Sequence, residues 1–181
     1  MPEVRMNPNR ITIAVDDQTI DILKYMIQET NASQSELIRR AIRFYHEYSN
    51  LLKDKEKIEN QIEMMSSNEH IILDVDHWIL FLKFIEDHPN KEEFWNKHEK
   101  IALSHAEQLS YKIKTAKDLL KRLESCGFFK LVENSNKEFT LVLFSELSKK
   151  FIKTFIEIFL SYIGLKIEIK EDIEKLRVKI K

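Results

Sequence analysis

The chain has 181 residues, 43% of them hydrophobic and 33% charged, which is enough apolar surface for one or two compact cores and excludes a disordered chain. Its 29 Lys and Arg against 30 Asp and Glu give a net charge of −1, so any nucleic-acid binding requires a local patch. One cysteine excludes an internal disulfide, and neither a secretory leader nor an apolar run of ~18 residues is found. We therefore expect a soluble, cytoplasmic protein with no membrane contact.

Large apolar side chains occupy every second position of residues 10–15, which predicts a short β-strand. One face of this strand is apolar and carries Ile11, Ile13 and Val15. The other face carries Arg10, Thr12 and Ala14.

Two helices are predicted after the strand. Asp16 supplies a cap for the first helix, which ends at Asn31, a residue that tolerates the left-handed conformation. Ser33 starts the second helix, and Glu36 three positions later predicts a capping box. A strand and two helices this short cannot bury a core in one chain. An identical antiparallel strand from a second chain would cover the apolar face, and we expect a dimer core formed by Ile11, Ile13, Val15, Leu23, Leu37, Ile38 and Ala41.

This order of elements resembles the ribbon-helix-helix family of the Arc, MetJ and CopG repressors. The resemblance covers residues 8–48 and is carried by the strand RITIAV, the turn NASQS and the helix LIRRAI. It implies a homodimeric, sequence-specific transcriptional regulator whose antiparallel ribbon enters the major groove of double-stranded DNA.

The resemblance also implies roles for single residues. Base edges would be read by Arg10, Thr12 and Ala14, and Ala14 offers only apolar contact, so direct readout is expected to be thin. DNA phosphates would be held by the helix start at Ser33, Gln34 and Ser35, with Arg5 as a phosphate-seeking arm. Residues 1–48 carry six basic and seven acidic residues, which predicts modest nonspecific affinity. We expect Arg39, Arg40 and Arg43 to be a solvated helix face or dimer contacts.

Residues 49–69 are rich in charge and predict a helical linker. Apolar residues continue at heptad spacing from Leu37 to Met65, with Lys55 as the break, so the second helix is expected to run on beyond Tyr48. We favour a coiled coil with the partner chain over a single solvated helix.

Residues 70–181 predict an α+β domain that combines an antiparallel sheet with helices on one face. Asp76 is expected to cap a helix that runs to His88, and further helices are expected at 91–110, 115–126 and 146–162. Apolar side chains alternate with polar ones in four segments, which predicts two pairs of strands: 128–132 with 139–144, and 165–169 with 176–180.

The order of elements in residues 91–181 resembles vinyl-reductase-type domains, which bind small hydrophobic molecules. The resemblance implies an apolar ligand pocket between the helix 146–162 and the sheet, lined by Phe151, Phe155, Ile158 and Phe159. These side chains also suit a plain hydrophobic core, which we favour, and a third possibility is that the domain pairs or docks with another protein.

Metal sensing is a weaker hypothesis. His77, His88, His98 and His105 lack the compact His-x-His pattern of nickel-responsive ribbon-helix-helix regulators, so we expect no metal and no cofactor. No nucleophile lies in a recognisable motif, so we expect no enzymatic activity.

The sequence thus favours a homodimeric regulator, with higher oligomers open, and an effector or oligomerisation domain behind the DNA reader. The alternatives are an antitoxin-like or other protein-interaction module that binds a protein partner, and a structural dimeriser that never meets DNA.

Overall fold

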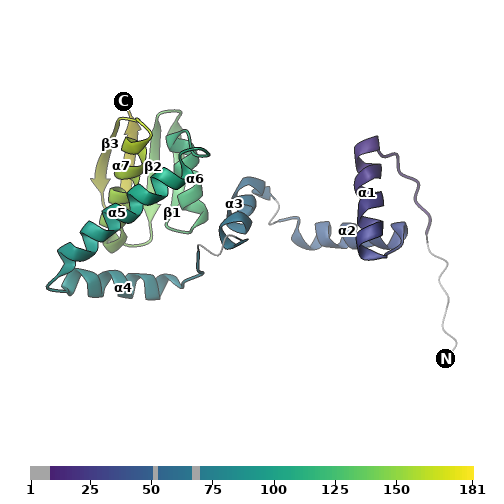
Figure 1. Ribbon diagram of the computed structural model, residues 1–181, viewed down its shortest axis with the longest axis horizontal. Helices are drawn as coiled ribbons and strands as arrows, with labels where there is room; N and C mark the ends of the chain where they lie inside the picture. Colours follow the sequence, from purple (N-terminus) through teal and green to yellow (C-terminus); the bar gives the residue numbers. More distant parts are fainter. Residues whose placement is uncertain (1–8, 51–52, 67–69) are drawn as a thin grey trace. The chain divides into compact units, whose positions relative to one another are not determined.

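A computed structural model describes residues 9–50, 53–66 and 70–181 (Figure 1). The chain divides into two compact units, Met1–Lys53 and Asp54–Lys181. Arg5 lies outside the described residues, as does Leu51 of the predicted heptad seam.

The first unit consists of an irregular lead segment and two helices. Residues 9–16 form no regular secondary structure in the single chain. Helix α1 (Asp17–Thr30) is capped by Asp16, whose carboxylate accepts from the Thr19 amide at 2.7 Å. It ends at Asn31, which has the predicted left-handed backbone with φ of 52°. Helix α2 (Gln34–Tyr48) follows immediately.

The two helices bury very little between them. In α1 no residue is buried, and in α2 only Leu37 is, at 6% exposure. Large apolar side chains on both helices face water, among them Ile22, Tyr25, Ile42, Phe44 and Tyr45. Described alone, this unit is two amphipathic helices without a core.

The prediction that α2 runs on beyond Tyr48 was wrong. Ser49 and Asn50 form a turn, and α3 (Lys55–Ser66) begins as a separate helix. Local side-chain bonds account for the break. The Ser49 hydroxyl donates to the His46 carbonyl, and the Asp54 carboxylate accepts from the Lys57 amide at 3.1 Å, as a helix N-cap does.

Helix α3 packs on α6 within the second unit. Met64 is its one buried residue, and the Gln61 side-chain amide donates to the Ser125 carbonyl at 3.2 Å. Ion pairs join the two helices at Lys121 with Glu56 and at Arg122 with Glu63. The linker residues 55–66 therefore form a helix that packs on α6.

The remaining helices of the second unit lie close to their predicted positions. They are α4 (Val75–Asp87), α5 (Lys91–Leu109), α6 (Ala116–Ser125) and α7 (Lys149–Tyr162), which follows a 3-10 turn at Glu146–Ser148. Asp74, rather than the expected Asp76, caps α4, because its carboxylate accepts from the Asp76 and His77 amides. A full capping box between Thr115 and Asp118 starts α6.

Four antiparallel strands form one sheet in the order β1-β2-β4-β3 (Figure 1). The strands are β1 (Phe129–Ser135), β2 (Glu138–Leu143), β3 (Ile167–Asp172) and β4 (Lys175–Ile180). The two hairpins turn more tightly than predicted, at Asn136–Lys137 and at Ile173–Glu174. Gly127 and Gly164 lead out of α6 and α7 with φ of 81° and 80°, a conformation that favours glycine.

One face of the sheet is covered by helices and forms the core. Side chains of α6, α7 and alternate strand positions meet there, among them Leu120, Ile156, Phe159, Leu160, Phe129, Leu141 and Leu176. The other face carries exposed polar side chains, for example Glu138, which pairs with Lys179 at 2.7 Å. This is the predicted α+β architecture. Among the described residues, no helix is both long enough and apolar enough to cross a membrane.

Candidate nucleic-acid interface

The predicted base-reading residues lie together in the lead segment of the first unit. Arg10, Thr12 and Ala14 are exposed, and the apolar residues between them are exposed as well. Ile11 is 83% exposed and Ile13 is 56% exposed, although the hydrophobic effect disfavours leaving such side chains in water. A β-strand needs a partner strand for its backbone hydrogen bonds, and none of the described residues of the single chain pairs with residues 9–16 in this way.

The predicted phosphate site lies at the start of α2. The Ser33 hydroxyl accepts from the Glu36 amide at 3.2 Å, so Ser33 is the predicted N-cap. The amides of Gln34 and Ser35, in the first turn, have no intrahelical acceptor in an α-helix. Together with the helix dipole, they make this end of α2 suited to an anion.

The capping box expected from Glu36 is only half formed. Its carboxylate does not return to Ser33 but accepts from Arg39 at 2.7 Å and from Arg40 at 3.0 Å. The two guanidinium groups lower the pKa of Glu36 from its ordinary value. Two of the three arginines of α2 are therefore held by an acidic residue of their own helix.

The predicted dimer-core residues differ in burial in the single chain. Leu37 is buried, Leu23 and Ile38 are half-buried, and Ala41 is exposed. The three strand residues Ile11, Ile13 and Val15 are exposed. Arg5, the predicted phosphate-seeking arm, lies outside the described residues.

Comparison with protein families gives a match to this part of the chain. Residues 9–49 match the family described as ribbon-helix-helix protein, copG family. They form a ribbon-helix-helix domain. A domain of this family makes the protein a DNA-binding transcription regulator. No curated protein and no solved structure matches the chain. The resemblance of residues 91–181 to vinyl-reductase-type domains therefore stays a prediction.

The predicted pocket residues of the second unit lie along α7. Phe159 is fully buried in the core, and Phe151, Phe155 and Ile158 are half-buried. Phe151 belongs to an aromatic cluster, with its ring 4.9 Å from that of Trp78 and 3.9 Å from that of His98. None of the four residues lines the hollow at the start of α4 or the one at the α4–α5 corner.

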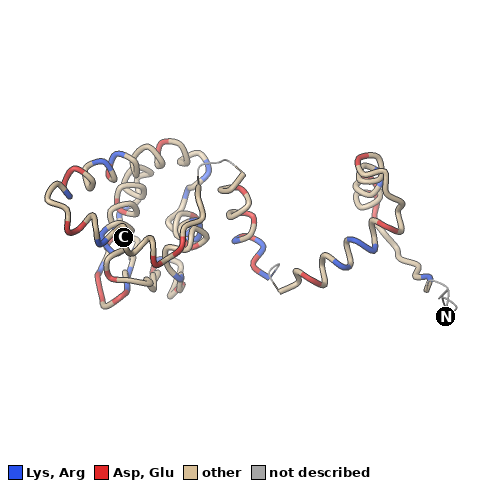
Figure 2. The backbone as a smooth tube through the Cα atoms, turned by 90° about the horizontal axis from the view of Figure 1, so that it is seen from below, with Lys and Arg blue, Asp and Glu red and all other residues tan. Residues whose placement is uncertain are grey.

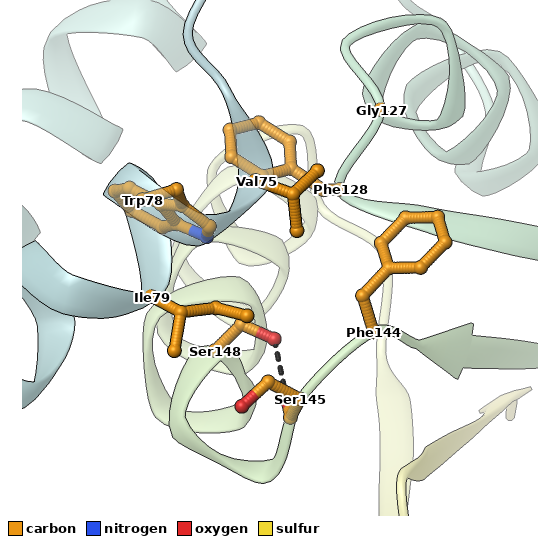
Figure 3. Close-up of a pocket in the computed structure, with 8 residues that line it drawn as sticks. All are labelled: Val75, Trp78, Ile79, Gly127, Phe128, Phe144, Ser145 and Ser148. Atoms are coloured by element: carbon orange, nitrogen blue, oxygen red, sulfur yellow. Dashed lines mark hydrogen bonds between the residues drawn. The ribbon is translucent and has the colours of Figure 1, made fainter.

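One of these hollows lies between the start of α4 and the loops that flank the β1–β2 hairpin (Figure 3). Val75, Trp78 and Ile79 of α4 face Phe128 and Phe144 across it, and Ser145 and Ser148 close one side. Its volume of about 20 Å³ suits one water molecule rather than an organic ligand. The Ser148 hydroxyl donates to the Ser145 carbonyl at 2.8 Å.

The four histidines weighed as metal ligands each have a local contact. His77 lies 3.4 Å from the Asp74 carboxylate, and His88 accepts from the Asn90 amide. His98 is buried, with Nε2 3.0 Å from the Phe151 carbonyl, and His105 lies beside the Phe155 ring. Burial lowers the pKa of His98. Among the described residues, no three His, Cys, Asp or Glu side chains gather as a metal site would require.

The docking of α3 on α6 was missed by the sequence reasoning. The Cys126 thiol lies 3.3 Å from the Met64 sulfur at this contact, and burial raises the pKa of the thiol. Lys112 adds an ion pair to Glu63. Asp54, placed three residues before Lys57, was the available signal, because it marks a helix start where the heptad pattern predicts a helix interior.

Proposed function

We propose that the protein reads DNA as a homodimer in which residues 10–15 of two chains form an antiparallel ribbon in the major groove. One observation supports this above all others: the ribbon-helix-helix unit has a single buried residue, Leu37, among its described residues 9–50. Two amphipathic helices without a core are not stable alone. A second copy supplies the missing apolar cover.

Pairing divides the lead segment by face. Ile11, Ile13 and Val15 turn inward onto α1 and α2, because successive side chains of a strand point to opposite faces. Arg10 and Thr12 then point outward from both strands. A two-stranded ribbon fits the major groove, where Arg10 suits the O6 and N7 acceptors of guanine and Thr12 suits an acceptor or a thymine methyl.

Phosphate contacts then fix the position of the ribbon in the groove. The α2 starts of the two subunits offer the amides of Gln34 and Ser35 to DNA phosphates on each side. Arg39 and Arg40 of the same helix are paired with Glu36, which reduces the support that their charges give to these contacts. Figure 2 shows acidic and basic residues interspersed along the described part of the chain. Sequence-independent affinity is accordingly expected to be low.

The second unit acts, in this proposal, as an oligomerisation or sensory domain without catalytic activity. It has its own core and a complete sheet, so it folds independently of DNA. This favours a regulator over an antitoxin-like module, whose partner-binding segment is typically short and disordered until bound. A screen of small molecules for those that raise the melting temperature of the chain would identify an effector.

DNA binding by substituted chains tests the proposal. A duplex is first selected from a pool with a randomised core, and its affinity is measured by fluorescence anisotropy. Arg10→Ala and Thr12→Ala should each weaken binding by about 5- to 150-fold, which corresponds to the ~1–3 kcal/mol of a good base contact.

The matched control is Lys24→Ala, which removes a basic residue on α1 that pairs with Asp21. It should leave the affinity within about twofold, as surface substitutions usually do. The proposal fails if neither Arg10→Ala nor Thr12→Ala changes the affinity, or if no duplex is selected by the native chain.

A further inference from the structure

Helix α3 covers a basic stretch of the second unit with acidic side chains. Residues 112–122 carry one acidic residue, Asp118, and five basic residues: Lys112, Lys114, Lys117, Lys121 and Arg122. Because the whole chain has a net charge of −1, this stretch is a local excess of positive charge. Helix α3 carries three acidic residues, and two of them, Glu56 and Glu63, pair with the basic stretch.

The ion pairs between α3 and this stretch join residues that are far apart in the sequence. Glu56 pairs with Lys121, and Glu63 pairs with Lys112. The first two partners are 65 residues apart and the second two are 49 apart, so both pairs depend on the packing of α3. Glu56 raises the pKa of Lys121, and Lys112 lowers the pKa of Glu63, so these groups are charged at neutral pH.

The pairing is incomplete at Arg122. This residue is 8% exposed, and its Nη1 atom lies 3.6 Å from Glu63 without a hydrogen-bond partner among the described residues. Glu63 serves two cations, because it also pairs with Lys112. The Asp118 carboxylate is engaged elsewhere, since it accepts from the Thr115 amide in the capping box of α6. A buried guanidinium nitrogen without a hydrogen bond costs free energy, so this face favours an anion with more acceptor oxygens.

We propose that Lys112, Lys121 and Arg122 form a binding face for DNA phosphates, and that α3 is an autoinhibitory helix whose carboxylates occupy this face. A phosphate offers several acceptor oxygens to one guanidinium, which suits Arg122 better than a shared carboxylate does. DNA is the polyanion that the ribbon-helix-helix domain binds, so the choice of ligand rests on DNA binding by that domain. The face lies outside residues 9–49 and would add contacts that read no base sequence.

The packing of α3 is weak enough for DNA to displace it. Met64 is the one buried residue of this helix, and one hydrogen bond joins Gln61 to the Ser125 carbonyl. Partly exposed ion pairs add little stability and are screened by salt. An element with so few buried contacts opens locally at a low free-energy cost.

DNA phosphates can also reach the face before α3 leaves it. The side chains of Lys121 and Lys112 are 30% and 41% exposed beside their α3 partners. The closely spaced phosphates of a duplex compete there with two carboxylates, and the release of counterions from the duplex favours the exchange at low salt. Displacement of α3 then uncovers Arg122.

The salt dependence of DNA binding by the full chain tests the proposal. Glu56→Gln and Glu63→Gln are combined, and binding to a duplex of random sequence is measured by fluorescence anisotropy at several salt concentrations. We expect an affinity about tenfold higher than that of the native chain at low salt. The slope of log affinity against log salt should steepen by about 2–3, at ~0.9 for each cation that reaches a phosphate.

The matched control combines Glu59→Gln with Glu93→Gln. It removes the same two negative charges, but Glu59 pairs with Lys55 and Glu93 pairs with Lys97, each within its own helix. The slope should therefore stay within about 0.5 of the native value, because no basic face is uncovered.

Two further substitutions trace the gain to this face. Lys112→Gln and Lys121→Gln, added to the Glu56→Gln and Glu63→Gln chain, should return the affinity and the slope to the native values. Both lysines are partly exposed, so their replacement leaves the core of the second unit in place.

Hydrogen exchange of the native chain follows the displacement itself. At a duplex concentration that saturates binding at low salt, the backbone amides of residues 55–66 should exchange faster than in the free chain, because α3 leaves α6. The amides of the core helix α7 should be unaffected and serve as the internal reference.

Equal slopes for the two acidic double variants, or a gain that survives Lys112→Gln and Lys121→Gln, would overturn the proposal. Exchange of residues 55–66 that is unchanged or slower with bound DNA would also overturn it, as would a gain with double-stranded RNA but not with DNA. The gain is measured again with Arg10→Ala present, where it should persist. The selected duplex tests the ribbon separately, so either proposal can fail without the other.

Discussion

Replacing Ile13 with alanine tests the ribbon through the dimer dissociation constant. Ile13 is 56% exposed in the single chain, and full burial of an isoleucine contributes about 1.5–3 kcal/mol. Covering the exposed part in the ribbon therefore contributes about 0.8–1.7 kcal/mol per chain and about 1.7–3.4 kcal/mol per dimer, since the residue occurs twice. At ~1.4 kcal/mol per factor of ten, Ile13→Ala should weaken dimerisation by up to roughly 15- to 270-fold.

Sedimentation equilibrium over a range of protein concentrations measures this change. Thr12→Ala is the matched control, because its side chain is expected on the outer face of the same strand and should shift the constant by no more than about twofold. A dissociation constant for Ile13→Ala equal to that of the control would refute the pairing of residues 10–15.

Three further predictions concern the second unit. Leu160→Ala, at a fully buried site, should lower the free energy of unfolding by about 2–5 kcal/mol in chemical denaturation, whereas Ile173→Ala should change it by less than about 0.5 kcal/mol. Burial holds the folded-state pKa of His98 below its ordinary 6.5, so the unfolded chain takes up the proton first, and stability should fall as the pH drops below 6.5 toward the folded pKa. His98→Phe should flatten this part of a stability–pH profile, and an unchanged slope would contradict the assignment. Lys112 and Arg122 lower the pKa of Glu63. The contribution of Glu63 to folding stability is therefore present above pH 4.5 and is lost as the pH falls through the folded-state pKa. Glu63→Gln should lower the free energy of unfolding by no more than about 1 kcal/mol at pH 7 and by nothing in acid, because the ion pair is largely solvated.

Much of the fold could be predicted because local signals agree with the tertiary structure. Ser33 caps α2, Asn31 adopts the left-handed conformation, and Gly127 and Gly164 follow α6 and α7 as expected. Alternation in residues 139–144 and 176–180 predicted two neighbouring strands of the sheet, β2 and β4. In each case the backbone geometry depends on the residue itself or on near neighbours.

The errors arose where two local preferences compete. Heptad spacing favours a continuous helix through residues 37–65, but Ser49 and Asp54 offer caps that end one helix and start another. Glu36 could bond to Ser33 or to two arginines one turn later, and only the coordinates show the second arrangement. The docking of Met64 on α6 depends on a surface far away in the sequence, which periodicity does not reveal.

The candidate site could be predicted from the sequence because the prediction depends on a pattern of residue types. The face of a strand follows from alternation alone, so Arg10 and Thr12 could be assigned without coordinates. Whether a partner strand covers Ile11 and Ile13 cannot be derived from one chain, since it is a property of two.

The scarcity of buried residues in the first unit has a consequence for how the protein responds to its own abundance. If that unit gains its core only on association, its folding is a second-order process, and the fraction of folded DNA readers rises with the concentration of the chain. The second unit has its own core in the single chain, so we expect its folding not to depend on association. At low concentration the chain would then have a folded second unit and an unfolded, protease-sensitive first unit, so that the expression level sets the fraction of chains able to occupy a promoter.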